Sequence, residues 1–215
     1  GALKDKPKTE HRAAITDPIE LGELMNSIDG YDGTPVVCAA LKLSALLFQR
    51  PGEIRHMEWG EINWEDELWS IPAAKMKMDR DHMVPLSRQS IEVLKDINRI
   101  TGSGIYVFPS QRGQSRPLSN NGVRTALRTM GYDNKAMSAH GFRATARTIL
   151  DEVHHVRVDY IEHQLAHAVK DATGRAYNRT KFLPERKQMM QRWADYLDEL
   201  RIHVGNNNIV PLRKV

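Results

Sequence analysis

Apolar side chains recur every three to four residues along most of this 215-residue chain, and one interval, residues 59–86, breaks that rhythm. Recurrence at this spacing places apolar side chains on one face of an α-helix, so most of the chain should be helical. Within residues 59–86 the apolar residues form three short runs separated by charged turns, a pattern typical of short strands. The sequence therefore predicts an α+β fold, predominantly α-helical, with a small three-stranded antiparallel sheet in the N-terminal half.

Capping residues and helix breakers set the expected element boundaries. Asp17 can accept hydrogen bonds from the first free amides of a helix, Pro18 suits the first helical position, and Gly102 suits a helix end. Helices are expected over residues 18–28 and 35–48, briefly from Arg50, from Ser87 to Gly102, from Ser119 to Gly131, after His140, and over residues 184–200. Because no linker or repeat separates these elements, we expect one domain over residues 17–201, with a flexible lead-in (1–16) and a C-terminal tail (202–215).

Composition excludes several classes of protein. No apolar run approaches the roughly 20 residues of a membrane-spanning helix, and no charged start followed by an apolar stretch resembles a signal peptide. Cys38 is the single cysteine, which excludes an internal disulfide framework and favours the reducing cytoplasm. With 40% hydrophobic and 27% charged residues, the composition is that of a globular protein. We therefore expect a cytoplasmic globular protein without a membrane span.

Charge is divided unevenly along the chain. Residues 1–110 carry a net charge of −4 and residues 111–215 one of +8, which together give the +4 of the whole. A basic half suggests a polyanionic partner such as nucleic acid, although surface charge is often uneven without one. Arg124 and Arg128 lie four residues apart on one expected helix, and Arg143 and Arg147 repeat the spacing on another. Residues four apart share a helix face, so each pair fits either phosphate contact or a solvated basic surface.

Two further patterns carry side chains suited to phosphate chemistry. His140 and Arg143 stand three residues apart at an expected helix start, where free amides favour an anion. Arginine offers a planar fork of donors to phosphate oxygens, and histidine exchanges protons near neutral pH. Tyr177 lies between Arg175 and Arg179, cationic neighbours that help a phenol with a pKa of about 10 to lose its proton. Taken singly, either pattern also fits a chance spacing or a basic surface.

Six positions together resemble the motifs of the tyrosine recombinases of the phage-integrase family. Residues 47–54 (LFQRPGEI), followed by Trp59, resemble its first arginine motif. In family order, the matching positions are Arg50, Lys77, His140, Arg143, His167 and Tyr177. The resemblance extends from about residue 16 to residue 200. The sequences around the matched positions are most similar to those of integrases of prophages and genomic islands. It implies the catalytic domain of a site-specific DNA recombinase.

This chain departs from the family pattern in small ways. His167 and Tyr177 are ten residues apart, where many members have nine, and Ala166 stands where glycine is common. Both departures fit the prophage and genomic-island branch. Lys75 lies close enough to Lys77 to compete for the role of the family's lysine between two strands.

The resemblance also implies a mechanism without metal ion or cofactor. Tyr177 is expected to attack the scissile phosphate, forming a 3′-phosphotyrosyl link and releasing a 5′-hydroxyl. Arg50 and Arg143 are expected to neutralise charge on the nonbridging oxygens, and His167 to add a hydrogen bond there. Glu53 would buttress the Arg50 region.

Proton transfer and partners follow from the same resemblance. Lys77 is expected to protonate the departing 5′-oxygen, and His140 to assist proton removal from the tyrosine. The implied partner is double-stranded DNA at attachment sites in a bacterial cytoplasm, close to the nucleoid. The full-length protein is expected to work as a tetramer, and the isolated domain is expected to be able to exist as a monomer. N-terminal DNA-binding domains, general in the family, are expected to be absent from this chain.

Three other functions remain open at this point. A type IB topoisomerase would use a related site to relax DNA. A DNA-binding module would use the same basic surface without chemistry. A metal-dependent hydrolase would use His163 and His167, spaced as on a zinc-binding helix, but Gln164 occupies the place where a metalloprotease needs its glutamate.

Overall fold

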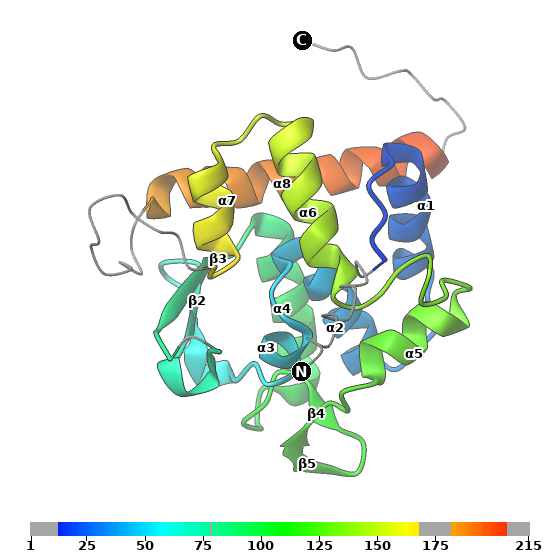
Figure 1. The fold of residues 1–215 in the computed structure, drawn as a ribbon. Helices are drawn as coiled ribbons and strands as arrows, with labels where there is room; N and C mark the ends of the chain where they lie inside the picture. The colour runs from blue at the N-terminus through cyan, green and yellow to red at the C-terminus, as the bar shows by residue number, and fades with distance from the viewer. Residues whose placement is uncertain (1–12, 78, 168–181, 206–215) are drawn as a thin grey trace, which may run out of the picture.

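The computed structural model describes residues 13–77, 79–167 and 182–205, and Figure 1 shows that helices form most of the molecule. The predicted antiparallel sheet is present, with strands β1 (Ile62–Asn63), β2 (Leu68–Ile71) and β3 (His82–Pro85) in that order. In the central strand, Trp69 lies opposite Ile62 on one side and Val84 on the other, and its side chain is fully buried. The α+β prediction is confirmed.

The helices follow the expected order. They are α1 (Pro18–Asp29), α2 (Pro35–Leu47), α3 (Pro51–Arg55), α4 (Arg88–Thr101), α5 (Gly122–Thr129), α6 (Gly141–Glu152), α7 (Val158–Gln164) and α8 (Leu183–Gly205), with 3-10 turns at Trp59–Glu61 and Ala73–Lys75. Asp17 caps α1 as predicted, accepting from the N–H groups of Ile19 and Glu20. The expected cap of α5 was wrong, because Asn121 occupies the N-cap and the Ser119 hydroxyl accepts from its N–H.

Two elements have no counterpart in the sequence predictions. The hairpin of β4 (Pro109–Ser110) and β5 (Gly113–Pro117) is polar and largely exposed, so no apolar alternation marks it. Helix α7 has seven residues, of which Ile161 is the one buried apolar side chain, too little for a helical period. Both elements depend on the tertiary structure around them.

Helix α2 is the centre of the hydrophobic core. Leu41, Leu43 and Leu47 are fully buried, and the helix contacts α1, α4, α5 and α8. Trp193 of α8 donates from its indole N–H to the carbonyl of Ala45 at 3.0 Å. A helix with so many apolar side chains is stable only where most of its surface is buried, and here α2 anchors the turn that follows it.

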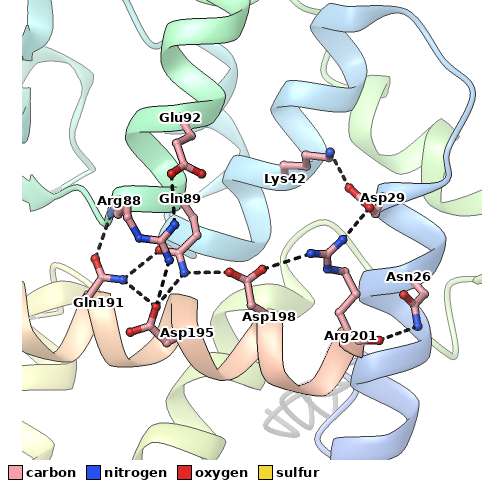
Figure 2. A network of polar contacts seen from close by, with 10 residues as sticks. All are labelled: Asn26, Asp29, Lys42, Arg88, Gln89, Glu92, Gln191, Asp195, Asp198 and Arg201. Carbon is pink, nitrogen blue, oxygen red and sulfur yellow. Dashed lines mark hydrogen bonds and ion pairs between the residues drawn. The ribbon is translucent and has the colours of Figure 1, made fainter. Parts of the chain in front are cut away.

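The longest helix, α8, packs along α1 and is tied to its neighbours at the surface. Gly22 allows this approach, since a Cβ there would lie 2.6 Å from Val204 Cγ2 and 2.8 Å from the Leu200 carbonyl. Figure 2 shows the polar network beside it, in which Asp29 accepts from Arg201 and from Lys42, both at 2.7 Å. Further along α8, Gln89 of α4 donates to Asp195 and Asp198. These contacts hold α8 against α1 and α4, and they join α1 to α2.

Both ends of the domain are more ordered than predicted. Ile15, assigned to the flexible lead-in, is buried, and the Ala13 carbonyl accepts hydrogen bonds from Ser138. Helix α8 continues to Gly205, into the expected tail, whose residues 206–215 lie outside the described part. Among the described helices, none combines the length and apolar character needed to cross a membrane.

Candidate active site

Arg50 stands at a sharp turn between α2 and α3. Phe48 ends α2 in the left-handed conformation, with φ of 42°, and Pro51 begins α3 directly after Arg50. Arg50 Nη1 donates to Glu53 Oε1 at 2.7 Å, and the Arg50 backbone N–H donates to Glu53 Oε2 at 2.9 Å. Because Glu53 is buried and holds both ends of Arg50, it has the geometry of the expected buttress.

Arg143 of α6 lies beneath this turn and is 5% exposed. Its guanidinium donates from Nη1 to the Phe48 carbonyl at 3.1 Å and from Nη2 to the Leu165 carbonyl at 2.7 Å. Burial, together with the nearby charge of Arg50, lowers the pKa of Arg143 to about 10. The side chain therefore stays charged at neutral pH in a place where its charge is costly, and an anion bound beside it would be strongly stabilised.

His167 follows the end of α7 and contacts Arg143. Its Nε2 lies 3.2 Å from Arg143 Nη2, and its Nδ1 lies 2.6 Å from Glu162 Oε2. The preceding Ala166 has φ of 49°, in the left-handed region where glycine is favoured, which accounts for the glycine common in the family at this place. This turn directs the histidine back towards α6.

The other matched residues line a groove next to this cluster. Arg50, Lys77 and His140 border one groove of about 1100 Å³, and His56 and Arg124 also line it. Figure 1 shows α3, which begins directly after Arg50, and the start of α6, which follows His140, close together in the middle of the molecule with the end of α7 nearby. Arg50 therefore connects the groove to the Arg143–His167 pair. Tyr177 lies outside the described residues.

The structure separates the two candidate lysines. Lys75 Nζ donates to the His56 carbonyl at 2.9 Å, to Glu58 at 2.7 Å and to Glu61. Burial lowers the pKa of Lys75, but its hydrogen bonds to the two carboxylates outweigh that effect and raise it. Lys77 is exposed, and no residue in the described part of the chain forms a hydrogen bond or ion pair with it. Lys77 is thus the better placed of the two to give up a proton in the groove.

One arginine of each pair at helical spacing, Arg128 and Arg147, is engaged away from the candidate phosphate site. Arg128 donates to the carbonyls of Tyr132 and Met137 and to the side chain of Asn134, so it braces the turn after α5. Arg147 pairs with Asp151 and with Glu162. For these two arginines the structure does not support phosphate contact, one of the two alternatives that the spacing left open, because carbonyl and carboxylate groups of the chain already engage them. Arg124 is exposed on the groove.

His163 and His167 do not point at a common ligand site. His163 is buried and packs edge-on against the ring of Phe182, with 5.4 Å between ring centroids. His167 directs its two nitrogens to Glu162 and Arg143. Residues spaced four apart fail to share a face here because α7 ends between them. This geometry disfavours the zinc-helix alternative.

A buried polar network, not foreseen from the sequence, holds the end of α7 in place. The Gln164 carbonyl accepts from Gln49 Nε2 at 2.9 Å, and His82 Nε2 lies 3.1 Å from the same oxygen. The Gln164 side-chain oxygen accepts from Nε and Nη2 of the fully buried Arg186. Burial keeps the pKa of His82 well below its ordinary value, so it stays neutral. Gln49 and Gln164 adjoin the matched motifs, and that adjacency was the one sequence signal available.

Comparisons with known proteins identify the family of the chain. The model of the phage integrase family matches residues 17–183. The chain is 39% identical over 212 residues to the integrase of Enterobacteria phage P4, covering 92% of this chain and 48% of that protein. It is 40% identical over 176 residues to prophage integrase IntZ of Escherichia coli K12, covering 82% and 42%. It spans about half the length of the curated relatives it matches.

Solved structures show the same fold. The lambda integrase catalytic core superposes with a TM-score of 0.54 at 19% identity, covering 78% of this chain and 98% of that one. The XerA recombinase gives a TM-score of 0.58 at 13% identity, covering 96% and 68%. Fold and sequence together define an integrase-type domain. The chain belongs to the phage integrase family, and its similarity is to the integrases of prophages.

Proposed function

We propose that this chain is the catalytic domain, over residues 17–201, of a site-specific tyrosine recombinase that cleaves and rejoins double-stranded DNA through a 3′-phosphotyrosyl intermediate. The observation that carries the proposal is the buried, charged Arg143 beside Arg50 and His167. Burying a charge is costly unless a partner compensates for it. A DNA phosphate bound at this point would provide that compensation.

In the proposed reaction, Tyr177 attacks phosphorus, a new phosphorus–oxygen bond forms to the tyrosine, and the bond to the 5′-oxygen breaks. Arg50 and Arg143 stabilise the charge on the nonbridging oxygens, which divalent metals do in many nucleases. His167 donates a further hydrogen bond to the phosphate.

Two groove residues handle the protons in this scheme. His140 accepts the phenolic proton of Tyr177, and Lys77 supplies one to the departing 5′-oxygen. Reversal of these steps rejoins the strand, and the covalent link conserves the energy of the phosphodiester.

The partners proposed for the whole protein follow from its structural relatives. Lambda integrase has been solved as a dimer bound to a core site and as a tetramer bound to a Holliday junction. We propose that the full-length protein likewise acts on attachment-site DNA as a tetramer in the bacterial cytoplasm. Further DNA-binding domains would lie in the half of its length that this chain does not span, so this chain alone should bind DNA weakly and with steep salt dependence.

Covalent capture on DNA tests the proposal. A labelled pool of duplexes, each with a nick at a fixed place in a randomised sequence, lets the cleaved end diffuse away and traps the protein on DNA. We expect an adduct that survives denaturation and EDTA with the parent chain, enrichment of one sequence over successive rounds, and no adduct with Tyr177→Phe. Adduct formation without sequence enrichment would favour a topoisomerase, and binding without adduct would favour a DNA-binding module.

A further inference from the structure

The side chain of Glu162 lies between the proposed phosphate site and the outer face of α6. Its Oε2 is 2.6 Å from His167 Nδ1, and its Oε1 is 3.3 Å from Arg147 Nε. Arg147 is itself held by Asp151, with Nη1 and Oδ2 2.5 Å apart. Both carboxylate oxygens of Glu162 are therefore engaged, and the side chain cannot rotate without losing a charged partner.

These partners determine where the imidazole of His167 carries its proton. A carboxylate only accepts hydrogen bonds, so Nδ1 must be the donor to Glu162. A guanidinium only donates, so Nε2 must accept from Arg143 across 3.2 Å. In the DNA-free protein His167 is thus the neutral tautomer protonated on Nδ1, with its lone pair on Nε2 directed at Arg143.

This arrangement has a consequence when a phosphate arrives at Arg143. An anionic oxygen there takes over the Nη2 donor. Nε2 can then donate to the phosphate only after it gains a proton from solvent water, since Nδ1 remains bonded to Glu162. The carboxylate of Glu162 lies against the ring and stabilises the resulting imidazolium, as a buried aspartate does for the histidine of serine proteases. The ring stays in one orientation through both states.

We propose that Glu162 is a positioning residue for strand cleavage, which orients His167, keeps Nδ1 protonated and directs Nε2 to the phosphate beside Arg143. This inference rests on the proposed recombinase function. Glu162 does not touch DNA in this scheme and acts entirely through His167. Arg147 supports Glu162 from the other side, which accounts for an arginine that the helix spacing had suggested for DNA contact.

Two variants, each replacing a carboxylate by an amide of nearly the same size, distinguish this role from a purely structural contact between α6 and α7. Glu162→Gln removes the charge at His167, whereas Asp151→Asn removes the other ion pair of the same Arg147 and leaves His167 untouched. We expect Glu162→Gln to slow adduct formation about ten- to a hundredfold, the range seen when the hydrogen-bond partner that orients a metal-bound histidine is removed, with DNA affinity nearly unchanged. Asp151→Asn should cleave at close to the parent rate.

The double variant supplies a readout that a bracing role would not affect. If Glu162 acts through His167, Glu162→Gln should slow cleavage no further in a His167→Gln background. Equal slowing in both backgrounds would overturn the proposal, as would equal rates for Glu162→Gln and the parent.

Nitrogen-15 NMR of the imidazole tests the same inference on the DNA-free chain, independently of cleavage. The parent should show His167 protonated on Nδ1, with its signals assigned by their loss in His167→Gln, and Glu162→Gln should lower the fraction of this tautomer because a neutral amide oxygen is a weaker acceptor than a carboxylate. A parent protonated on Nε2 would overturn the role of Glu162. Failure of the parent to form any DNA adduct would instead reject the recombinase function and leave the NMR result standing.

Discussion

The choice between Lys75 and Lys77 as proton donor leads to a prediction in which the two neighbouring lysines behave in opposite ways. Replacing each by methionine keeps the aliphatic stem and removes the charge. Lys75 loses three hydrogen bonds when it is changed, to the His56 carbonyl, Glu58 and Glu61. Lys77 loses none to a described residue, because it lies exposed on the groove.

The sizes of the two effects follow from these contacts. A hydrogen bond to a charged group contributes about 1.5–3 kcal/mol when buried, and an exposed ion pair contributes about 0–1 kcal/mol. The Glu61 side chain is 9% exposed and that of Glu58 is 32% exposed, so the first figure suits Glu61 and the second suits Glu58. Lys75→Met should therefore cost about 2–4 kcal/mol, or roughly 5–15 °C in Tm for a chain of this size. Lys77→Met should stay within about 0.5 kcal/mol of the parent.

Cleavage should show the reverse order. Loss of a general acid slows a reaction by about 10²- to 10⁴-fold, which we expect for Lys77→Met, while Lys75→Met below its Tm should cleave nearly normally. A substrate with sulfur in place of the scissile 5′-oxygen, made on the sequence obtained by covalent capture, needs no acid because a thiol has a pKa near 8.5. This substrate should restore Lys77→Met to close to the parent rate and leave Arg50→Ala slow. The assignment of Lys77 as the general acid would be refuted if Lys77→Met cleaved the ordinary substrate at the parent rate and the sulfur substrate restored cleavage by Lys75→Met.

Three other predictions concern the frame of the molecule and its charge. Gly22→Ala should lower Tm, because a Cβ 2.8 Å from the Leu200 carbonyl forces α8 away at a cost of about 1–3 kcal/mol. The gain in helix propensity is about 1 kcal/mol and offsets only part of this cost. An unchanged or higher Tm in thermal unfolding would contradict this prediction. Burial and the nearby Arg192 lower the pKa of His154 to about 4, so as the pH falls His154 is protonated in the unfolded chain before it is protonated in the folded one. The free energy of unfolding should therefore decrease as the pH drops from 6.5 towards 4. In urea unfolding, His154→Phe should show a weaker pH dependence of this free energy, and an equal dependence would exclude His154 as the cause. Arg50→Ala should abolish adduct formation while far-UV circular dichroism stays that of the parent, and cleavage at a near-normal rate would remove Arg50 from the proposed site.

Helix capping and apolar periodicity, which depend on neighbouring residues, were sufficient to predict the starts of α1 and α4 and the position of the sheet. Asp17 caps α1 as predicted, and Ser87, where a helix was expected to begin, caps α4; each side chain accepts from amides within three residues. The three strands also lie in the interval where the apolar period changes. The sequence did not reveal α7 or the β4–β5 hairpin, because few of their side chains are buried and other elements hold them in place.

The sequence by itself determined the helical frame, the small sheet and the order of the six matched residues, because periodicity, capping and motif spacing are properties of neighbouring positions. Only the tertiary structure decided which charged side chains are free to bind an external anion. The Arg143 guanidinium is held by carbonyls 95 and 22 positions away, and the carboxylates that engage Lys75 lie 17 and 14 positions before it. Charge on a side chain is visible in the sequence, but its availability depends on burial and on partners that only folding brings within hydrogen-bond distance.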